Sequence, residues 1–176
     1  MTSVTFSVRP LGAPDQSILW DIFHVALWDP PPAPLRPRSV LGHPDVRIYA
    51  EEWGRREGDV GVAGEVEGHA GIVGACWMRL IRGGRGLAYL DDETPQLGIA
   101  LFPEFQRRGY GERLMRAALD AARAYGYRKV ALTVHPENPA GALYRRCGFE
   151  QFDVRRGYLA MVNDLARAND AALRTA

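Results

Sequence analysis

The sequence predicts one domain of the α/β (α+β) class, with a mixed central sheet of six to seven strands and about four helices. Segments with the apolar patterns of strands are interspersed with segments whose apolar residues recur at helical spacing. The chain has 176 residues, of which 47% are hydrophobic and 24% charged, which is typical of a single globular domain with its own core. We place this domain at residues 1–163 and a C-terminal tail at 164–176.

The first half opens with a strand and two helices. Alternating apolar and polar residues predict a strand at 4–9. Asp15 is a suitable N-cap for a helix at 16–28, and a second helix is expected at 44–53. The proline-rich segment 29–38 between them excludes regular structure and is interpreted as a stiff surface loop.

The middle of the chain predicts a β-hairpin with strands at 60–66 and 71–81. The glycine-rich segment 83–86 opens no helix and lacks the third glycine of a dinucleotide fingerprint, so it is interpreted as a turn.

The second half alternates strands and helices. Strands are expected at 95–102 and 129–134, with a helix between them that ends at Tyr125. Asn138 is a suitable N-cap for a helix that runs to Cys147. A last strand pair is expected at 149–155 and 158–163.

Composition and charge exclude several classes of function. The 22 basic and 21 acidic residues give a net charge of +1, which argues against nucleic acid as a partner. The basic residues include a single lysine, Lys129; coding bias toward arginine explains this, although arginine also suits the binding of anionic ligands. The longest apolar run, 70–78, is too short to span a membrane, and we expect no signal peptide. Cys76 and Cys147 fit no metal-ligand spacing, so we expect free thiols, no metal and a cytoplasmic location.

A candidate anion site lies between the strand at 95–102 and the helix that follows. Arg107 and Arg108 precede Gly109 and Gly111 at the start of this helix. Unpaired N–H groups at a helix N-terminus bind anions, and glycine lets a phosphate approach the backbone. The lysine and hydroxyl residue of a P-loop are absent from this motif. The residues therefore favour a pyrophosphate-like ligand, with a tight turn and solvated arginines as the alternative.

Two motifs in this order resemble the GCN5-related N-acetyltransferase (GNAT) superfamily. The first is Gln106-x-x-Gly109-x-Gly111, which directly follows a strand, and the second is the run from Asn138 to Phe149. The resemblance covers residues 60–160, and the first 55 residues fit the strand–helix–helix opening of that fold.

The resemblance implies that acetyl-CoA is the cosubstrate and lies between two splayed parallel strands, 96–101 and 129–134. A bulge is expected in the first strand, which would free backbone groups. The residues to which this implies a cofactor-binding role are Ile99, Ala100 and Leu101 through the main chain, Arg107, Arg108, Gly109, Tyr110 and Gly111 at the pyrophosphate, and Asn138 at the cofactor arm.

The same resemblance implies that Tyr144 is the general acid that protonates the departing thiolate. Members of the family place a glutamate base at the positions held here by Gln96 or Thr133, and neither residue can act as a carboxylate base. The remaining candidates for the base are Asp91, Asp92, Glu93, His135 and Glu137, of which Glu93 is preferred.

The expected acceptor is the primary amine of a small molecule or amino-acid-like compound. In such folds segments 29–38 and 153–158 wall its pocket, with Trp28, Trp53 and Trp77 as further candidates. A carboxylate on the acceptor would suit the four arginines of those segments, Arg36, Arg38, Arg155 and Arg156. Two alternatives stay open: a peptide or protein N-acetyltransferase, and a non-catalytic acyl-CoA-binding module. A homodimer is also left open.

Overall fold

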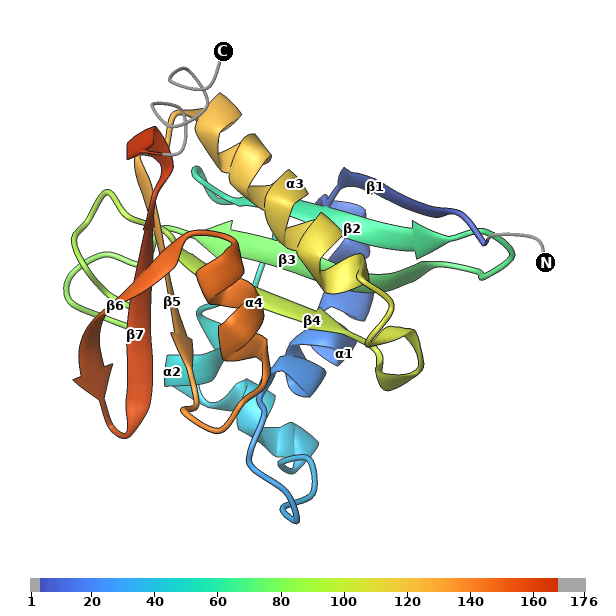
Figure 1. Cartoon of the computed structure of the whole chain (residues 1–176), viewed down its shortest axis with the longest axis horizontal. Helices are drawn as coiled ribbons and strands as arrows, with labels where there is room; N and C mark the ends of the chain where they lie inside the picture. The colour runs from blue at the N-terminus through green and yellow to red at the C-terminus, as the bar shows by residue number, and fades with distance from the viewer. Residues whose placement is uncertain (1–3, 168–176) are drawn as a thin grey trace.

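The computed structural model describes residues 4–167, and its strands form one seven-stranded sheet with the order β1-β2-β3-β4-β5-β7-β6 (Figure 1). The strands are β1 (Phe6–Pro10), β2 (Val60–Val66), β3 (Ile72–Arg79), β4 (Gln96–Leu101), β5 (Lys129–Val134), β6 (Phe149–Arg155) and β7 (Tyr158–Asp164). The mixed sheet predicted from the sequence is confirmed, as are the bounds of β2, β5 and β6.

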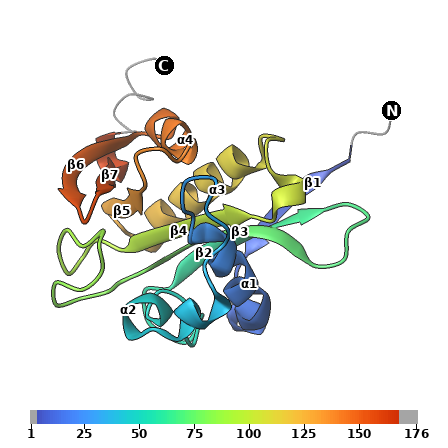
Figure 2. The same cartoon turned by 90° about the horizontal axis from the view of Figure 1, so that it is seen from below.

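Within residues 4–167, four α-helices cover the sheet on its two faces. Their bounds are α1 (Gln16–Ala26), α2 (Pro44–Arg47), α3 (Tyr110–Tyr125) and α4 (Ala140–Arg146). Helices α1 and α2 lie on one face, and α3 and α4 lie on the other (Figure 2). Because both faces are covered, every residue of β3 is buried, although the strand is antiparallel to both neighbours.

The two faces of the sheet carry separate apolar clusters. One stripe of α3, made by Leu114, Met115, Ala118, Leu119 and Ala122, is buried on the first face. On the opposite face, Leu19, Ile22 and Phe23 of α1 pack with Trp53 and Trp77. Burial of these side chains holds both helical layers against the strands.

The sheet divides between β4 and β5, the two parallel strands at its centre. A single pair of residues, Gln96 and Ala131, faces across this junction, and the Ala131 N–H donates to the carbonyl oxygen of Pro95 at 3.0 Å. Beyond that point the strands diverge, as the family resemblance predicted. The expected bulge in β4 is wrong, because its pairing with β3 keeps one register from Gly74–Leu101 to Arg79–Gln96.

Predicted bounds of several elements differ from the structure by a few residues, such as the end of α1 at Ala26 instead of 28, and two differences have a clear physical reason. Helix α2 ends at Arg47 instead of continuing to Trp53, and turns follow because the 48–53 segment packs on the core and gives main-chain carbonyls to the buried Arg79 guanidinium. The side chain of Asp15 does not cap α1; it accepts the N–H of Gly12 at 2.9 Å and pairs with Arg9.

The C-terminal boundary expected at residue 163 also needs correction. Strand β7 includes Asp164, and Leu165 is 2% exposed, with its N–H donating to the carbonyl oxygen of Arg128 at 2.9 Å. The fold therefore continues past that boundary, and the remainder of the predicted tail, 168–176, lies outside the described residues.

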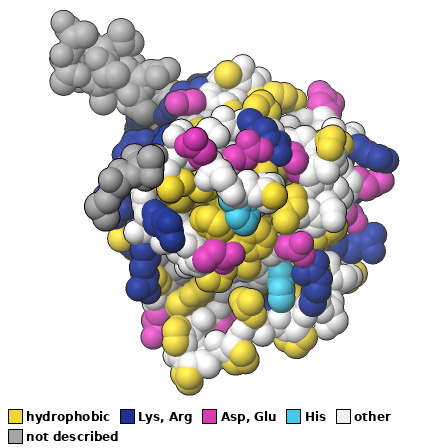
Figure 3. All heavy atoms as spheres, turned by 90° about the vertical axis from the view of Figure 1, so that its right-hand side faces the viewer, with side chains coloured by type: hydrophobic (Ala, Val, Ile, Leu, Met, Phe, Trp, Pro, Cys, Tyr) yellow, Lys and Arg dark blue, Asp and Glu magenta, His cyan; other side chains and the backbone are white. Residues whose placement is uncertain are grey.

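Basic and acidic side chains are interspersed over the face shown in Figure 3, in keeping with a net charge of +1. Within residues 4–167, no helix is long and apolar enough to cross a membrane.

Candidate active site

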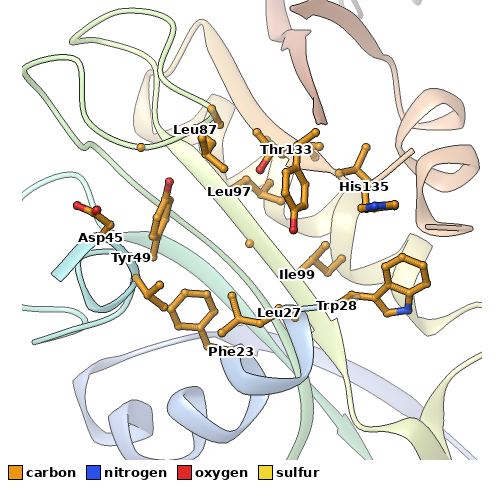
Figure 4. Close-up of a pocket in the computed structure, with 18 of the residues that line it drawn as sticks. Phe23, Leu27, Trp28, Asp45, Tyr49, Leu87, Leu97, Ile99, Thr133 and His135 are labelled. Atoms are coloured by element: carbon orange, nitrogen blue, oxygen red, sulfur yellow. The ribbon is translucent and has the colours of Figure 1, made fainter. Parts of the chain in front are cut away.

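A cleft of about 720 Å³ lies where β4 and β5 diverge. Figure 4 shows Leu97 and Ile99 of β4 opposite Thr133 and His135, at the carboxyl end of β5. The end of α1 and the loop after it close one side, whereas α2 and the segment after it close another. Because the sheet itself opens here, residues from both of its faces reach the same space.

The edge of β4 that faces the cleft presents free main-chain groups. The Phe102 N–H donates to Val73 of β3, whereas the carbonyl groups of Pro95 and Leu101 bond on the opposite side, to Ala131 and to the Gln106 side chain. Main-chain groups alternate in direction along a strand, so those of Ile99 point toward β5, where within residues 4–167 no strand pairs with them. Ala100 points its main-chain groups toward β3, unlike its neighbours, so the structure does not bring it to this edge.

Tyr144 lies on α4 and its ring lines the cleft. The residue is 8% exposed, and its ring packs against Phe149 with ring centroids 6.2 Å apart. Burial is the main cause that raises the pKa of the hydroxyl, with the Cys76 thiol as a smaller one. Among the described residues the hydroxyl has no hydrogen-bond partner, yet it is not a fully enclosed atom. It is therefore a protonated donor open to the cleft.

The turn before α3 has the backbone that an anion site needs. Gly109, at the N-cap, has φ of 79°, and Arg107 also lies in the left-handed region at 60°. The Gln106 amide donates to the carbonyl oxygen of Leu101 at 2.9 Å and so ties the turn to the end of β4. The Tyr110 ring stacks on Phe6 at 4.2 Å, which fixes the first turn of the helix.

The side chains around this turn leave its N-terminal groups accessible. Arg107 and Arg108 are exposed, and the Arg108 guanidinium lies 6.0 Å from the centre of the Phe105 ring. A Cβ at Gly111 would lie 3.5 Å from Leu143 of α4, which is ordinary contact distance. The turn lies beside the cleft and not in its lining, at the start of the longest described helix.

Asn138 lines the cleft at the start of α4. Its Oδ1 accepts the N–H of Ala140 at 3.0 Å. The helix begins at Ala140 and the N-cap position falls on Pro139, one residue later than predicted. The Asn138 side chain nevertheless satisfies a free N–H of the helix start, which leaves its amide group for other contacts.

The preferred base, Glu93, lies away from the cleft. It is exposed and outside the lining, and its own N–H donates to Asp91 at 3.0 Å. Asp92 accepts from the Gly83 N–H and from the Tyr89 hydroxyl. The three acidic residues therefore form a solvated turn, and the geometry brings none of them to Tyr144.

His135 is the one base candidate from the sequence that lines the cleft. Its ring lies between Trp28 and Tyr158, with centroids 5.7 Å from each. The Nδ1 atom accepts the N–H of Glu137 at 3.2 Å. In the neutral ring the proton is therefore on Nε2, so the nitrogen with the lone pair is already engaged.

Gln96 occupies one of the two positions at which the family resemblance placed a glutamate base. Its side chain here has a structural role. It is 1% exposed, accepts from the Tyr49 hydroxyl at 3.0 Å, and donates to the Arg85 carbonyl oxygen at 2.8 Å. Gly86 packs directly against this amide, because a Cβ at that position would overlap Gln96 Oε1. Gln96 and Tyr49 therefore hold the 84–88 loop against the cleft.

Three of the four arginines expected to bind an acceptor carboxylate are occupied. Arg36 pairs with Asp29 at 2.6 Å, and Arg38 pairs with Asp21. Arg155 pairs with Asp153 and donates to the main-chain carbonyl groups of Leu87 and Tyr89. That expectation is corrected: of the four, only Arg36 and Arg156 line the cleft, and only Arg156 has no ion pair among the described residues.

Several lining residues were missed by sequence reasoning. Asp45 and Tyr49 come from α2 and the turn after it, and Arg85 comes from the glycine-rich segment interpreted only as a turn. Of the three tryptophans named as candidate lining residues, Trp28 and Trp77 line the cleft. Trp53 does not: it is 1% exposed and lies beneath the Arg79 guanidinium. No local pattern marks such residues, because the cleft is formed by segments that meet only in the fold. Among residues 4–167, no three His, Cys, Asp or Glu side chains gather as a metal site.

Comparison with known families agrees with this architecture. Residues 20–149 match the Acetyltransferase (GNAT) family. The chain therefore belongs to this family, as the two motifs of its second half indicated.

Curated relatives match over shorter segments. The ribosomal protein bS18-alanine N-acetyltransferase of Salmonella typhimurium is 38% identical over 68 residues, which are 38% of this chain and 46% of the relative. An uncharacterized N-acetyltransferase of Methanocaldococcus jannaschii, MJ1207, is 44% identical over 62 residues, or 34% of this chain and 27% of that protein. The matches span less than half the length of these relatives.

Solved structures share the fold at low sequence identity. The ribosomal-protein-S18-alanine N-acetyltransferase from Escherichia coli has a TM-score of 0.62 at 18% identity, over 92% of this chain and 94% of its own. The PaiA N-acetyltransferase from Thermoplasma acidophilum, in complex with coenzyme A, has a TM-score of 0.64 at 16% identity, over 91% and 99%. The putative acetyltransferase yncA from Salmonella typhimurium, with acetyl-CoA, has a TM-score of 0.60 at 16% identity, over 91% of this chain and 94% of its own.

Proposed function

We propose that the chain transfers the acetyl group of acetyl-CoA to a primary amine by direct attack, in the cleft between β4 and β5. One observation carries this proposal: Tyr144 and Ile99 line the same cleft, and within residues 4–167 the Tyr144 hydroxyl has no hydrogen-bond partner and no strand pairs with Ile99 on that side. Family membership supports it, as do structural neighbours solved with acetyl-CoA and with coenzyme A.

The cosubstrate would bind along β4 and the turn that follows. Its pantetheine arm adds to the main-chain groups of Ile99 and to the N–H of Leu101, as an extra strand would. Arg107 through Gly111 receive the pyrophosphate at the start of α3, and the free part of the Asn138 amide contacts the arm. The residues of this turn are accessible, which supports the assignment.

The chemistry requires little of the protein beyond positioning and hydrogen bonding. The amine nitrogen attacks the thioester carbonyl carbon, the new C–N bond forms, and the C–S bond breaks. A main-chain N–H of β4 polarises the carbonyl group as an oxyanion hole does. Because burial keeps the Tyr144 hydroxyl protonated, it can donate to the thiolate as that group leaves. Cys147 is buried at the end of α4, so we assign it no covalent step.

The cleft volume of about 720 Å³ and its mixture of apolar and polar lining residues suit the amine of a small molecule. A second candidate acceptor is the N-terminal amine of a protein. It is favoured by the partial match to enzymes named for the alanine of ribosomal protein bS18. A cytoplasmic location and the oligomeric state stay predictions.

One experiment separates these functions. Calorimetry measures acetyl-CoA binding, a thiol-release assay measures turnover with small amines and with a peptide that begins with alanine, and mass spectrometry identifies the acetylated product. The proposal expects binding and one acetylated amine for each thiol released. Binding without any product would instead establish a non-catalytic acyl-CoA-binding module.

A further inference from the structure

The walls of the cleft carry more positive than negative charge. Three arginines line it, Arg36, Arg85 and Arg156, whereas Asp45 is the one carboxylate among the described lining residues. Arg36 is paired with Asp29, but Arg85 and Arg156 form no ion pair within residues 4–167. The Asp45 side chain is 74% exposed at the rim. The arginines therefore repel a cationic acceptor, whereas the carboxylate that could attract it, Asp45, is exposed to solvent and screened.

Among the described residues, the inner part of the cleft holds no carboxylate, and its amide and imidazole acceptors already accept hydrogen bonds. Thr133 is not a base, and the Gln96 amide is held by two hydrogen bonds. His135 uses Nδ1 to accept the Glu137 N–H. At the rim, His43 uses Nδ1 in the same way for the N–H of Asp45, at 3.2 Å.

Two tyrosines of the cleft, Tyr49 and Tyr144, keep their protons at neutral pH. Burial raises the pKa of Tyr49 to about 12 and also raises the pKa of Tyr144. The Tyr158 hydroxyl accepts a hydrogen bond from Arg36 at 3.0 Å. As neutral phenols, neither Tyr49 nor Tyr144 takes a proton from an ammonium ion at pH 7.

Apolar side chains surround the space between these groups. Phe23, Leu27 and Trp28 face Leu97 and Ile99 across the cleft (Figure 4). An ammonium ion that enters loses hydration without gaining a carboxylate partner, so the environment favours the neutral amine.

We propose that the acceptor is an apolar or aromatic primary amine that enters this cleft uncharged, so that its own protonation sets the pH dependence of transfer. This inference rests on the proposed acetyl transfer. The neutral nitrogen attacks the carbonyl carbon, the C–N bond forms and the C–S bond breaks. The nitrogen loses one proton and the sulfur gains one, passed through the Tyr144 hydroxyl, so the products are an uncharged amide and the free thiol.

A pair of amines of nearly equal shape tests the inference. Phenethylamine and its β,β-difluoro analogue differ mainly in the pKa of the ammonium group, which fluorine lowers. In a thiol-release assay from pH 6 to 10, we expect the rise of kcat/KM to end at each amine's own pKa, so the two profiles are displaced. The displacement persists in Asp45→Asn and His135→Gln. Profiles that break at one common pH would place a base on the protein and overturn the inference, although acetyl transfer would stand. Failure of acetyl-CoA to bind by calorimetry would instead remove the proposed function.

A second arm tests the charge of the walls. Replacement of both Arg85 and Arg156 by Gln is expected to lower the KM for spermidine several-fold while acetyl-CoA affinity stays the same. Arg38→Gln is the matched control, because Arg38 pairs with Asp21 and does not line the cleft. A wild-type protein that prefers spermidine to phenethylamine would contradict the inference.

Discussion

The Tyr49 hydroxyl donates a hydrogen bond of 3.0 Å to Gln96 and so joins the segment after α2 to the first residue of β4. Gln96 in turn donates to the Arg85 carbonyl oxygen. Two walls of the cleft are therefore held by one buried amide, at the point where β4 and β5 separate. The position that the family can use for a glutamate is here a fixed structural link.

Gln96→Leu removes this link and leaves the Tyr49 hydroxyl and the Arg85 carbonyl group without partners. We expect the free energy of unfolding to fall by about 1–3 kcal/mol and the KM for the amine to rise, with little change in acetyl-CoA affinity. Urea denaturation and steady-state kinetics measure the two effects. Gln151→Leu, at an exposed position of β6, is the control. Equal stability of the two variants would contradict the assigned role.

Tyr144→Phe removes the donor to the leaving thiolate. We expect kcat to fall roughly 10- to 1,000-fold with little loss of stability, because the hydroxyl has no partner among the described residues. Tyr127→Phe is the matched control, because the Tyr127 hydroxyl lies outside the cleft and donates to the Gly58 carbonyl oxygen at 2.6 Å. That variant should lose about 1–3 kcal/mol of stability and keep its kcat. An unchanged kcat in Tyr144→Phe would refute the assignment.

The two glycines at the start of α3 should respond differently to alanine. Gly109 has φ of 79°, so Gly109→Ala is expected to cost about 1–2 kcal/mol of stability. At Gly111 the new methyl group meets Leu143 at 3.5 Å, an ordinary contact, and the fold should keep its stability. If the pyrophosphate lies against this backbone, Gly111→Ala still weakens acetyl-CoA binding by calorimetry. Unaltered binding in Gly111→Ala would place the pyrophosphate elsewhere.

Alkaline pH should destabilise the fold through its buried tyrosines. Burial raises the pKa of Tyr49 to about 12, and it also raises the pKa values of Tyr127 and Tyr144. The unfolded chain releases these protons near pH 10, whereas the folded chain retains them, so stability is complete below pH 10 and falls above it. The expected slope is about 1.4 kcal/mol per pH unit for each tyrosine. Urea denaturation between pH 8 and pH 11 measures it, and Tyr127→Phe should reduce the slope. A flat profile would contradict the burial of these hydroxyls.

Much of the fold could be predicted because its local signals agree with its packing. The apolar runs of β3 and β5 are largely or wholly buried, as a sheet covered on both faces requires. The length of helix α2 was overestimated. Arg79, which forms a buried ion pair with Asp59 at 2.7 Å, also binds main-chain carbonyl groups of the 48–53 segment and so holds it in turns. That pairing spans 20 residues and leaves no mark on the local sequence.

The candidate site was predictable where one short motif supplies the residues. The turn at 106–111 and the run from Asn138 to Tyr144 are such motifs. The acceptor side was not, because Asp45, Tyr49 and Arg85 meet only in three dimensions. The tasks of Gln96 and Arg155 also depend on partners far along the chain. Their residue types alone suggested catalysis and ligand binding, whereas the fold uses both to hold the 84–90 loop.

The central claim is that this cleft transfers an acetyl group to an amine. The most direct test incubates the protein with acetyl-CoA and a panel of apolar amines, spermidine and a peptide that begins with alanine, and identifies products by mass spectrometry. Wild type and Tyr127→Phe should form an acetylated amine in equal molar amount to free CoA, and Tyr144→Phe should form far less. No acetylated product from any acceptor, with acetyl-CoA still bound by calorimetry, would contradict the account.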